Sequence, residues 1–127
     1  MNVLVVDTSS WISYFKGKPL PDLDLALKEG RVYLSPVVLA ELLSAKLKSN
    51  ERTQLESFLR DLPLCETPFE HWMRVGEFRA KCSLKGMQVS TPDAHIAQCC
   101  LDLDGYLLSE DQIFKKLHHL ISLKSLG

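Results

Sequence analysis

The chain opens with Asn2-Val3-Leu4-Val5-Val6, and Asp7-Thr8-Ser9-Ser10 follows at once. A short apolar run rich in β-branched residues, without polar alternation, is typical of a strand buried on both faces. The side chains that come next can all cap a helix, and residues 11–16 keep helical spacing until Gly17. The opening therefore predicts a buried strand that turns directly into a helix, with Asp7 at the junction.

The alternation of strand and helix continues along the chain. Further strands are expected at residues 31–34, 64–66, 106–108 and 120–123, and further helices at residues 22–30, 37–48, 50–62, 67–86, 91–103 and 111–117. This order predicts an α/β sandwich with a mostly parallel central sheet of four to five strands. In such sheets, sites form beyond the carboxyl ends of the strands.

The composition indicates one globular domain spanning residues 1–127, with 46% hydrophobic and 24% charged residues and no linker or repeat. No apolar run approaches the roughly 20 residues needed to cross a bilayer, and residues 1–6 lead into Asp7 rather than a cleavage site. We therefore expect a cytoplasmic protein. The formal net charge is −1. Any attraction for nucleic acid must then come from a local basic rim and from metal ions.

The four cysteines and the histidines show no metal-binding or disulfide pattern. There is no C-x-x-C pair, and Cys99 and Cys100 lie side by side in an apolar helical segment, where thiols usually act as small hydrophobes. His95 and Cys99 are four positions apart and could share a helix face, but two ligands do not make a zinc site. Core packing is the expected role of these residues.

Two acidic residues stand at positions that a surface role explains incompletely. Asp7 follows the first strand, where the crevice is expected, and is either a helix cap or a site residue. Glu41 interrupts the apolar run of residues 37–43, and no lysine or arginine is spaced to pair with it on the helix. A carboxylate buried in such a segment would need a partner, for which a metal ion qualifies, whereas a solvated glutamate at the edge of the face is the alternative.

Two further aspartates follow similar junctions. Asp93 lies in the first turn of a helix, where the helix dipole favours acids, but its neighbours Ile96 and Ala97 are apolar and point that face inward. Asp111 comes just after the strand at residues 106–108, and capping the next helix explains it adequately. By contrast, Asp102 and Asp104 are expected to be turn and helix-end residues outside any site.

Together these segments resemble the PIN-domain nucleases, especially their VapC-like toxin branch. The four stretches that carry the resemblance are VVDTSSWI (residues 5–12), LAEL (39–42), PDAHIA (92–97) and LSEDQIF (108–114), in the order and near the spacing of that family. Each motif is weak alone, whereas four in sequence are fairly specific. The resemblance implies that Asp7, Glu41, Asp93 and Asp111 are the catalytic, metal-binding carboxylates.

The resemblance also implies a three-layer α/β/α sandwich that cleaves RNA endonucleolytically with Mg²⁺ or Mn²⁺, leaving a 5′-phosphate and a 3′-hydroxyl. For the toxin branch it implies a homodimer and a small antitoxin protein that inserts into the active site. The family often carries a second acid just before the phenylalanine of its fourth motif, where this chain has Ile113. Asp111 then supplies the fourth carboxylate, alone or with Glu110.

The residues themselves favour the same chemistry. Oxygen ligands without imidazole suit hard ions such as Mg²⁺ and Mn²⁺, which can activate a water and stabilise a leaving oxyanion. Thr8, Ser9 and Ser109 could support the site through hydrogen bonds, or could simply cap helices and turns.

Other functions fit the sequence less completely. One is a housekeeping PIN nuclease that processes RNA without an antitoxin, and another is a PIN-like interaction module with an inactive site. A phosphoacceptor receiver domain also has an acidic crevice, but it needs an acidic pair after the first strand, where Asp7 stands alone.

Overall fold

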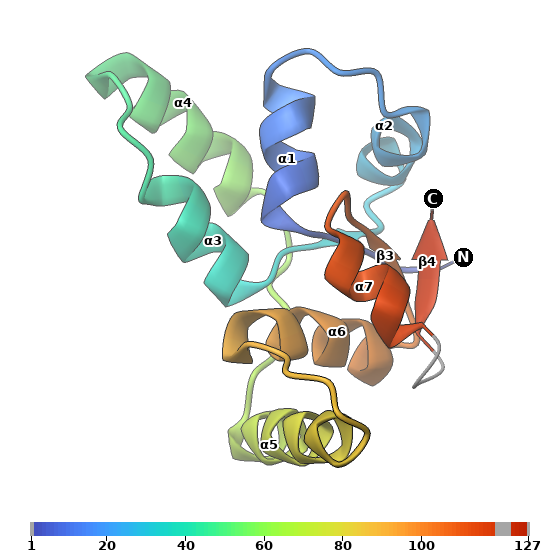
Figure 1. Ribbon diagram of the computed structural model, residues 1–127. Coiled ribbons are helices and arrows are strands. Elements are labelled where there is room, and N and C mark those ends of the chain that lie inside the picture. The colour runs from blue at the N-terminus through green and yellow to red at the C-terminus, as the bar shows by residue number, and fades with distance from the viewer. Residues whose placement is uncertain (1, 119–122, 127) are drawn as a thin grey trace.

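The computed structural model describes residues 2–118 and 123–126, and Figure 1 shows their arrangement. The helices are α1 (Thr8–Phe15), α2 (Pro21–Lys28), α3 (Pro36–Leu43), α4 (Ser49–Arg60), α5 (Phe69–Leu84), α6 (Thr91–Leu103) and α7 (Gln112–Leu117). The strands are β1 (Leu4–Val6), β2 (Val32–Tyr33), β3 (Tyr106–Leu108) and β4 (Lys124–Leu126). All three residues of β1 are buried, as the apolar opening predicts.

The described strands form one parallel sheet in the order β2-β1-β3-β4. The pairs Val5↔Tyr33 and Val5↔Leu107 place β1 in the centre of the sheet. The predicted α/β fold with a mostly parallel central sheet is therefore confirmed. Because β1 and β3 are parallel neighbours, their carboxyl ends meet at the same edge, where the backbone N–H of Asp7 donates to the carbonyl of Leu108 at 2.9 Å.

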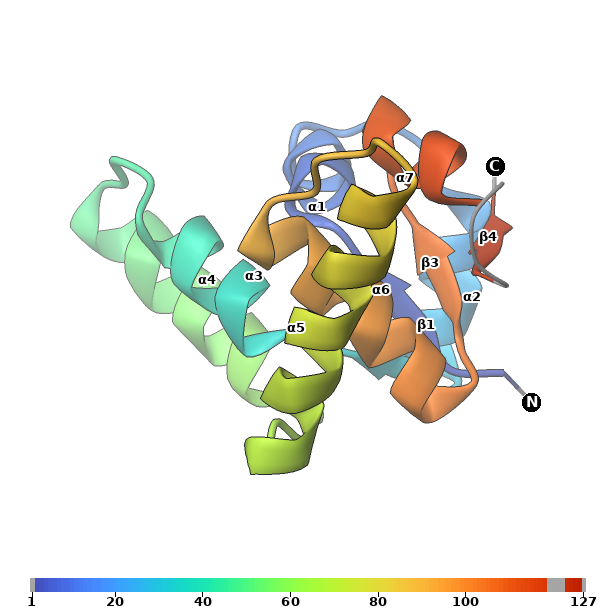
Figure 2. The same cartoon turned by 60° about the horizontal axis from the view of Figure 1, so that its bottom comes forward.

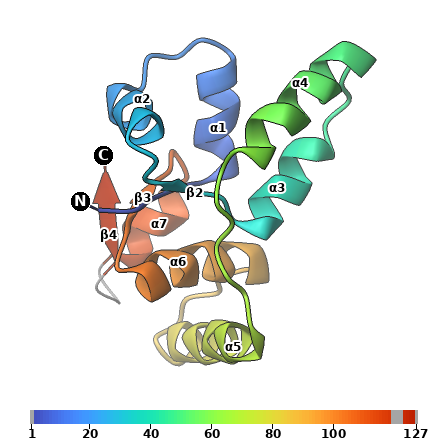
Figure 3. The same ribbon diagram turned by 180° about the vertical axis from the view of Figure 1, so that it is seen from behind.

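Helices cover the sheet in layers. Helix α6 packs against β1 and β3, and α5 lies outside α6, whereas α1 and α2 lie on the other side of the sheet (Figure 1). Helices α3 and α4 pack against each other as a pair that projects to one side of the sheet (Figures 2 and 3). No helix within the described ranges combines the length and apolar character that crossing a membrane requires.

Cap residues fix where the site-bearing helices begin. The side chain of Ser35 accepts from the backbone of Val37 and Val38 at the start of α3, and that of Ser90 accepts from Asp93 N at the start of α6. Each cap is followed by a proline in the first turn, as is typical of helix starts.

Two predicted elements differ in length. Helix α3, expected to reach residue 48, ends at Leu43, because the Arg52 guanidinium donates to the Leu43 carbonyl at 2.9 Å and so satisfies the helix end. The strand expected at residues 64–66 is only a bridge between Leu34 and Leu64. Prolines at positions 63 and 68 enclose that segment and cannot donate to a ladder.

The last strand lies later in the chain than expected. It was predicted at residues 120–123, of which residues 120–122 lie outside the described ranges and Leu123 is not in a strand. The strand is β4 at Lys124–Leu126, paired with β3 through Leu107 and Ser125.

Candidate functional site

Asp7 lies at the end of β1 and is the N-cap of α1, which confirms the first of its two expected roles. Its side chain is 6% exposed. One carboxylate oxygen, Oδ1, accepts from the backbone N–H of Thr8 at 2.8 Å. The other, Oδ2, accepts from the hydroxyls of Ser9 at 3.2 Å and Ser109 at 2.9 Å. These donors hold the buried carboxylate in one orientation.

Glu41 reaches the same region from α3. Its Oε1 accepts a 2.9 Å hydrogen bond from the hydroxyl of Thr8, which adjoins Asp7. The side chain is exposed, which agrees with the expected alternative of a solvated glutamate at the edge of the face and removes burial as an argument for a metal ion. Val38 and Leu42 face the core from the same helix, whereas Glu41 lies on its open side.

Asp93 is the half-buried member of the group, in the first turn of α6. Burial raises the pKa of its carboxyl above the usual range, although a hydrogen bond with Ser90 opposes this change. The negative charges of Asp111, Asp7 and Glu41 raise the pKa further. Because such repulsion falls off with distance, Asp111, Asp7 and Glu41 lie on the same side of the molecule as Asp93. Within the described residues, however, no three of the four have ligand atoms all within 4.8 Å of one another.

Asp111 is the N-cap of α7, and its Oδ1 accepts from the backbone of Ile113 at 3.0 Å. Its own backbone N–H donates to the Ser109 hydroxyl at 3.0 Å. Ser109 thus lies between Asp111 and Asp7, and each of the predicted supporting residues Thr8, Ser9 and Ser109 contacts at least one of the predicted carboxylates.

Glu110 points elsewhere. Its carboxylate accepts from the Ser13 hydroxyl at 2.7 Å and forms an ion pair with Lys18. These two donors lower the pKa of the Glu110 carboxyl. Asp111 is therefore the acid of the fourth motif that faces the other carboxylates.

The chemistry of this group fits a hard divalent cation. The donors are carboxylate and hydroxyl oxygens, and among the described residues none of the four carboxylates forms a salt bridge. Four acids that repel one another without a basic partner create a negative field that a cation would neutralise. Such a group could bind Mg²⁺ or Mn²⁺ at the carboxyl edge of the sheet.

A second polar cluster lies in the core between α5 and α6, and sequence reasoning missed it. Asp102, expected to be a helix-end residue without further role, accepts from His71, Arg74 and Gln98 at 2.7 to 3.0 Å. His71 in turn bonds His95, so the expected core-packing role of His95 omits its polar contacts. Only the spacing of Gln98 and Asp102 gives a local signal, because His71 lies 31 positions from Asp102.

This cluster is tighter than the group of carboxylates. The ligand atoms of His71, His95 and Cys99 all lie within 4.8 Å of one another, and no other group of three such side chains in the described ranges comes together in this way. Burial and the neighbouring His71 lower the pKa of His95 to about 4. The His95 ring is therefore neutral at neutral pH.

Comparison with known proteins gives a family match. Residues 4–120 match the PIN domain family. Among curated proteins, none shows significant similarity to the chain.

Solved structures share the fold. VapBC from Salmonella typhimurium bound to DNA aligns with a TM-score of 0.81 at 20% identity, covering 99% of this chain and 98% of that one. VapBC2 from Rickettsia felis bound to promoter DNA gives 0.79 at 21% identity, covering 98% and 97%. VapBC-5 from Mycobacterium tuberculosis, a member of the VapBC toxin-antitoxin systems, gives 0.71 at 21%, covering 99% and 98%.

Proposed function

We propose that this chain, which belongs to the PIN-domain family, is a metal-dependent endoribonuclease and the toxin of a toxin–antitoxin pair. Residues 1–127 would act as one nuclease domain in the cytoplasm. The observation that carries the proposal is the chain of hydrogen bonds at the edge of the sheet, in which Ser109 joins Asp7 to the backbone of Asp111 and Thr8 joins the start of α1 to Glu41. Burial, together with the charges of Asp111, Asp7 and Glu41, raises the pKa of Asp93 beside them. The four acids come from distant parts of the chain and form no salt bridge among the described residues. Their mutual repulsion would destabilise the folded chain, and a bound cation would remove it.

Asp7, Glu41, Asp93 and Asp111 would hold Mg²⁺ or Mn²⁺, directly or through water. Asp7 is suited to anchor the ion, because three donors already fix its buried carboxylate. Glu41 is exposed and tethered only through Thr8, so it can adjust to the ion or to substrate. When bound, the ion would supply Lewis-acid chemistry, making a water nucleophilic and stabilising negative charge on the phosphate.

The remaining polar groups would orient these acids. Ser109 bridges Asp7 and Asp111, so it sets their spacing across the sheet edge. Thr8 links the start of α1 to Glu41 on α3 in the same way. An RNA phosphate would approach from the open side, where Glu41 and Asp111 are exposed.

The partners follow from the same proposal. The similar structure of VapBC-5 is named as a member of the VapBC family of toxin–antitoxin systems, which supports a small antitoxin protein as partner of this chain. The sequence resemblance likewise supports a homodimer. RNA is the proposed substrate. Because the four carboxylates repel its phosphates, RNA binding would require the bound cation or a separate basic surface on the protein.

The test is RNA cleavage by the purified full chain. We expect cleavage of total cellular RNA with Mg²⁺ or Mn²⁺, none with excess EDTA, and products that carry a 5′-phosphate. Asp7→Asn and Asp93→Asn should reduce cleavage to background. Asp104→Asn is the matched control, because its side chain is 88% exposed and pairs with Lys124 instead. Equal loss in Asp104→Asn, or cleavage in EDTA, would contradict the proposal.

The toxin assignment needs its own measurement. Co-expression with the product of a short adjacent gene should yield a stable complex in which cleavage is suppressed. Cleavage that no such partner suppresses would instead indicate a housekeeping nuclease, and a folded chain without metal-dependent cleavage would indicate an inactive interaction module.

A further inference from the structure

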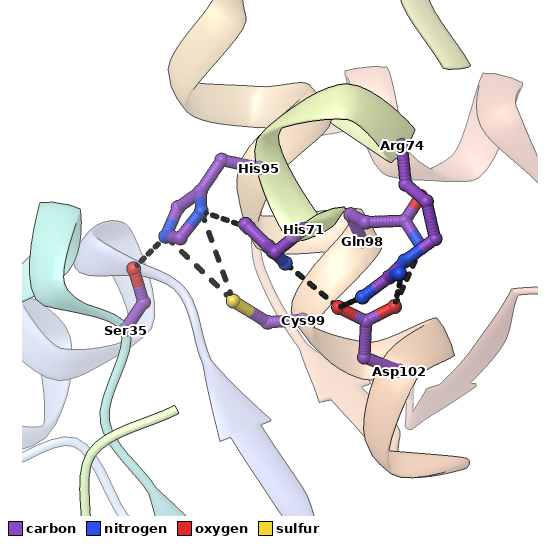
Figure 4. Close-up of polar contacts among 7 residues, drawn as sticks. All are labelled: Ser35, His71, Arg74, His95, Gln98, Cys99 and Asp102. Atoms are coloured by element: carbon purple, nitrogen blue, oxygen red, sulfur yellow. Dashed lines mark hydrogen bonds and ion pairs between the residues drawn. The ribbon is translucent and has the colours of Figure 1, made fainter. Parts of the chain in front are cut away.

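The second cluster joins three helices in the core. His71 comes from α5, His95 and Cys99 come from α6, and Ser35 caps α3 (Figure 4). Both histidines are fully buried, and Cys99 is 1% exposed. Three potential metal ligands thus converge in a part of the protein that is separate in chemistry from the carboxylates, because its donors are nitrogen and sulfur.

The hydrogen bonds leave one nitrogen of each ring on the inside of the cluster. The outer nitrogen of His71, Nδ1, bonds Asp102 at 2.7 Å, and the outer nitrogen of His95, Nε2, bonds Ser35 at 2.7 Å. The inner nitrogens, His71 Nε2 and His95 Nδ1, face each other at 2.8 Å (Figure 4). Metal-ligating histidines typically bind oxygen partners through their outer nitrogen, which fixes the ring and its tautomer.

We propose that His71 Nε2, His95 Nδ1 and Cys99 Sγ form a structural binding site for Zn²⁺. With Zn–N and Zn–S bonds of about 2.0–2.1 and 2.3 Å, two nitrogens on a tetrahedral ion lie about 3.3 Å apart, and nitrogen and sulfur about 3.6 Å apart. The inner nitrogens would therefore separate by roughly 0.5 Å. Cys99 Sγ already lies 3.9 Å from His95 Nδ1, although it is closer to Nε2 of the same ring, at 3.6 Å, so the ring would have to turn slightly toward the ion.

One further buried thiol lies near this group and would supply the fourth ligand by moving closer to it. Cys65 is close enough to Cys99 to raise the pKa of its thiol, but it is outside the three residues whose ligand atoms lie within 4.8 Å of one another. Two cysteines and two histidines are a common tetrahedral set for structural zinc. The two cysteines would bind as thiolates, whose charges balance that of the ion. Each thiol would therefore lose a proton when the ion binds. The ion would replace the hydrogen bond between the inner nitrogens and the contacts of the Cys99 thiol with the His95 ring.

The surroundings close this site to solvent. Trp72 stacks on the His95 ring at 4.8 Å between centroids. Arg74 bonds both oxygens of Asp102 and holds the carboxylate that orients His71. A zinc ion here would link α5, α6 and the start of α3, and so would set the relative positions of the helices that carry Asp93 and Glu41.

The direct test is metal analysis and cobalt substitution of the full chain without a histidine tag. Purified from zinc-containing medium, the chain should retain about one zinc ion per molecule after brief treatment with EDTA. Exchange with Co²⁺ should produce a sulfur-to-cobalt charge-transfer band in the near ultraviolet and quench the fluorescence of Trp72. The band requires a thiolate ligand, so this measurement on the unmodified chain is decisive even where a variant fails to fold.

Matched variants locate the ion. Cys99→Ser should abolish the charge-transfer band or shift it and lower retained zinc at least about tenfold. Cys82→Ser, which replaces another buried free cysteine on α5, should change neither. Asp7→Asn should retain zinc in full, which separates this site from the carboxylates. Absence of bound zinc, absence of the thiolate band, or equal loss in Cys82→Ser or Asp7→Asn would overturn the proposal, and the cluster would then be a hydrogen-bonded link only.

Discussion

The hydroxyl of Ser109 donates to Oδ2 of Asp7 at 2.9 Å, although 102 positions separate the two residues in the chain. The contact exists because β1 and β3 are parallel neighbours that end at the same edge of the sheet. Asp7 follows β1 directly and Ser109 follows β3 directly. The first and fourth sequence motifs therefore meet through one hydrogen bond, and the orientation of the Asp7 carboxylate depends on the pairing of the central strands.

Ser109→Ala should destabilise the protein by about 1–2 kcal/mol, because it removes a charge-assisted bond to Asp7 and the acceptor for Asp111 N. Ser9→Ala is the control. Its single bond to Asp7 is longer, at 3.2 Å, and alanine favours the helix, so the loss should stay below about 1 kcal/mol. Urea unfolding of the two variants provides the comparison. A loss in Ser9→Ala that equals or exceeds that in Ser109→Ala would contradict this ranking.

Mn²⁺ should raise the melting temperature of the unmodified chain and leave that of Asp7→Asn unchanged. Two carboxylates about 4 Å apart repel by about 4 kcal/mol at an effective dielectric near 20, and a bound cation removes this repulsion. At a Mn²⁺ concentration about 100 times Kd, binding stabilises the folded chain by about 2.7 kcal/mol. Without metal, Asp7→Asn should change stability by less than about 1 kcal/mol, because relief of repulsion offsets the lost hydroxyl bonds.

Glu110→Gln is the matched control for that experiment. Glu110 adjoins Asp111 but is bonded to Lys18 and Ser13, so its replacement should leave the Mn²⁺-dependent shift intact. Differential scanning calorimetry with and without Mn²⁺ measures both variants. A full shift in Asp7→Asn, or its loss in Glu110→Gln alone, would mean that the cation binds elsewhere.

Local patterns predict most of this fold. The apolar opening identifies β1, and the Ser-Pro and Thr-Pro pairs mark helix starts to within a few residues. These signals depend on neighbours in the sequence, which is why they can be read directly. The end of α3 could not be predicted in this way, because Arg52 caps it from the next helix.

The candidate sites show the same limit. The strand ends predict that Asp7 and Asp111 lie near one another, since parallel strands end together. The exposure of Glu41 depends on which face of α3 packs on the core. Because apolar residues occupy nearly all positions of this helix, the sequence does not indicate which face that is. The contacts of Asp102 with His71 and Arg74 cross between two helices, and no spacing within one helix reveals them.

The Tyr14–Asp24 contact should make stability sensitive to alkaline pH. The Tyr14 hydroxyl donates to Asp24 at 2.6 Å and joins α1 to α2. This hydrogen bond, burial and the Asp24 charge raise the pKa of Tyr14 above 10.0 in the folded chain. The folded state therefore favours the protonated phenol. The contribution of this contact to the free energy of unfolding is complete below pH 10 and is lost as pH rises through the raised pKa.

Tyr14→Phe should remove that contribution, about 1 kcal/mol, so variant and parent should converge in stability above the raised pKa. Tyr33→Phe is the control, since the Tyr33 hydroxyl has no carboxylate acceptor within the described part of the chain. Urea unfolding at several values between pH 8 and pH 11 tests this. If the free energies of unfolding of the parent and Tyr14→Phe differ by the same amount across this pH range, the difference does not come from the Tyr14–Asp24 contact.

Gly105 is required by a close approach between β3 and the start of the chain. A Cβ added there would lie 2.8 Å from the carbonyl oxygen of Val3, and that oxygen is fixed by a 2.8 Å hydrogen bond from Tyr106 N. Backbone must therefore move to admit even a methyl group. Gly105→Ala should lower stability by about 1–3 kcal/mol. It should also weaken the Mn²⁺-dependent shift, because β3 leads directly to Ser109.

Gly76→Ala provides the opposite case within the same chain. Gly76 lies inside α5, and a Cβ there would meet no atom within 4 Å. The alanine restricts the unfolded chain and suits the helix, so stability should rise by about 0.5–1 kcal/mol. Urea unfolding of the two variants should thus give changes of opposite sign. If Gly105→Ala is as stable as the parent chain, the carbonyl of Val3 can move freely, and the central strands do not fix the edge at which Asp7 and Ser109 meet.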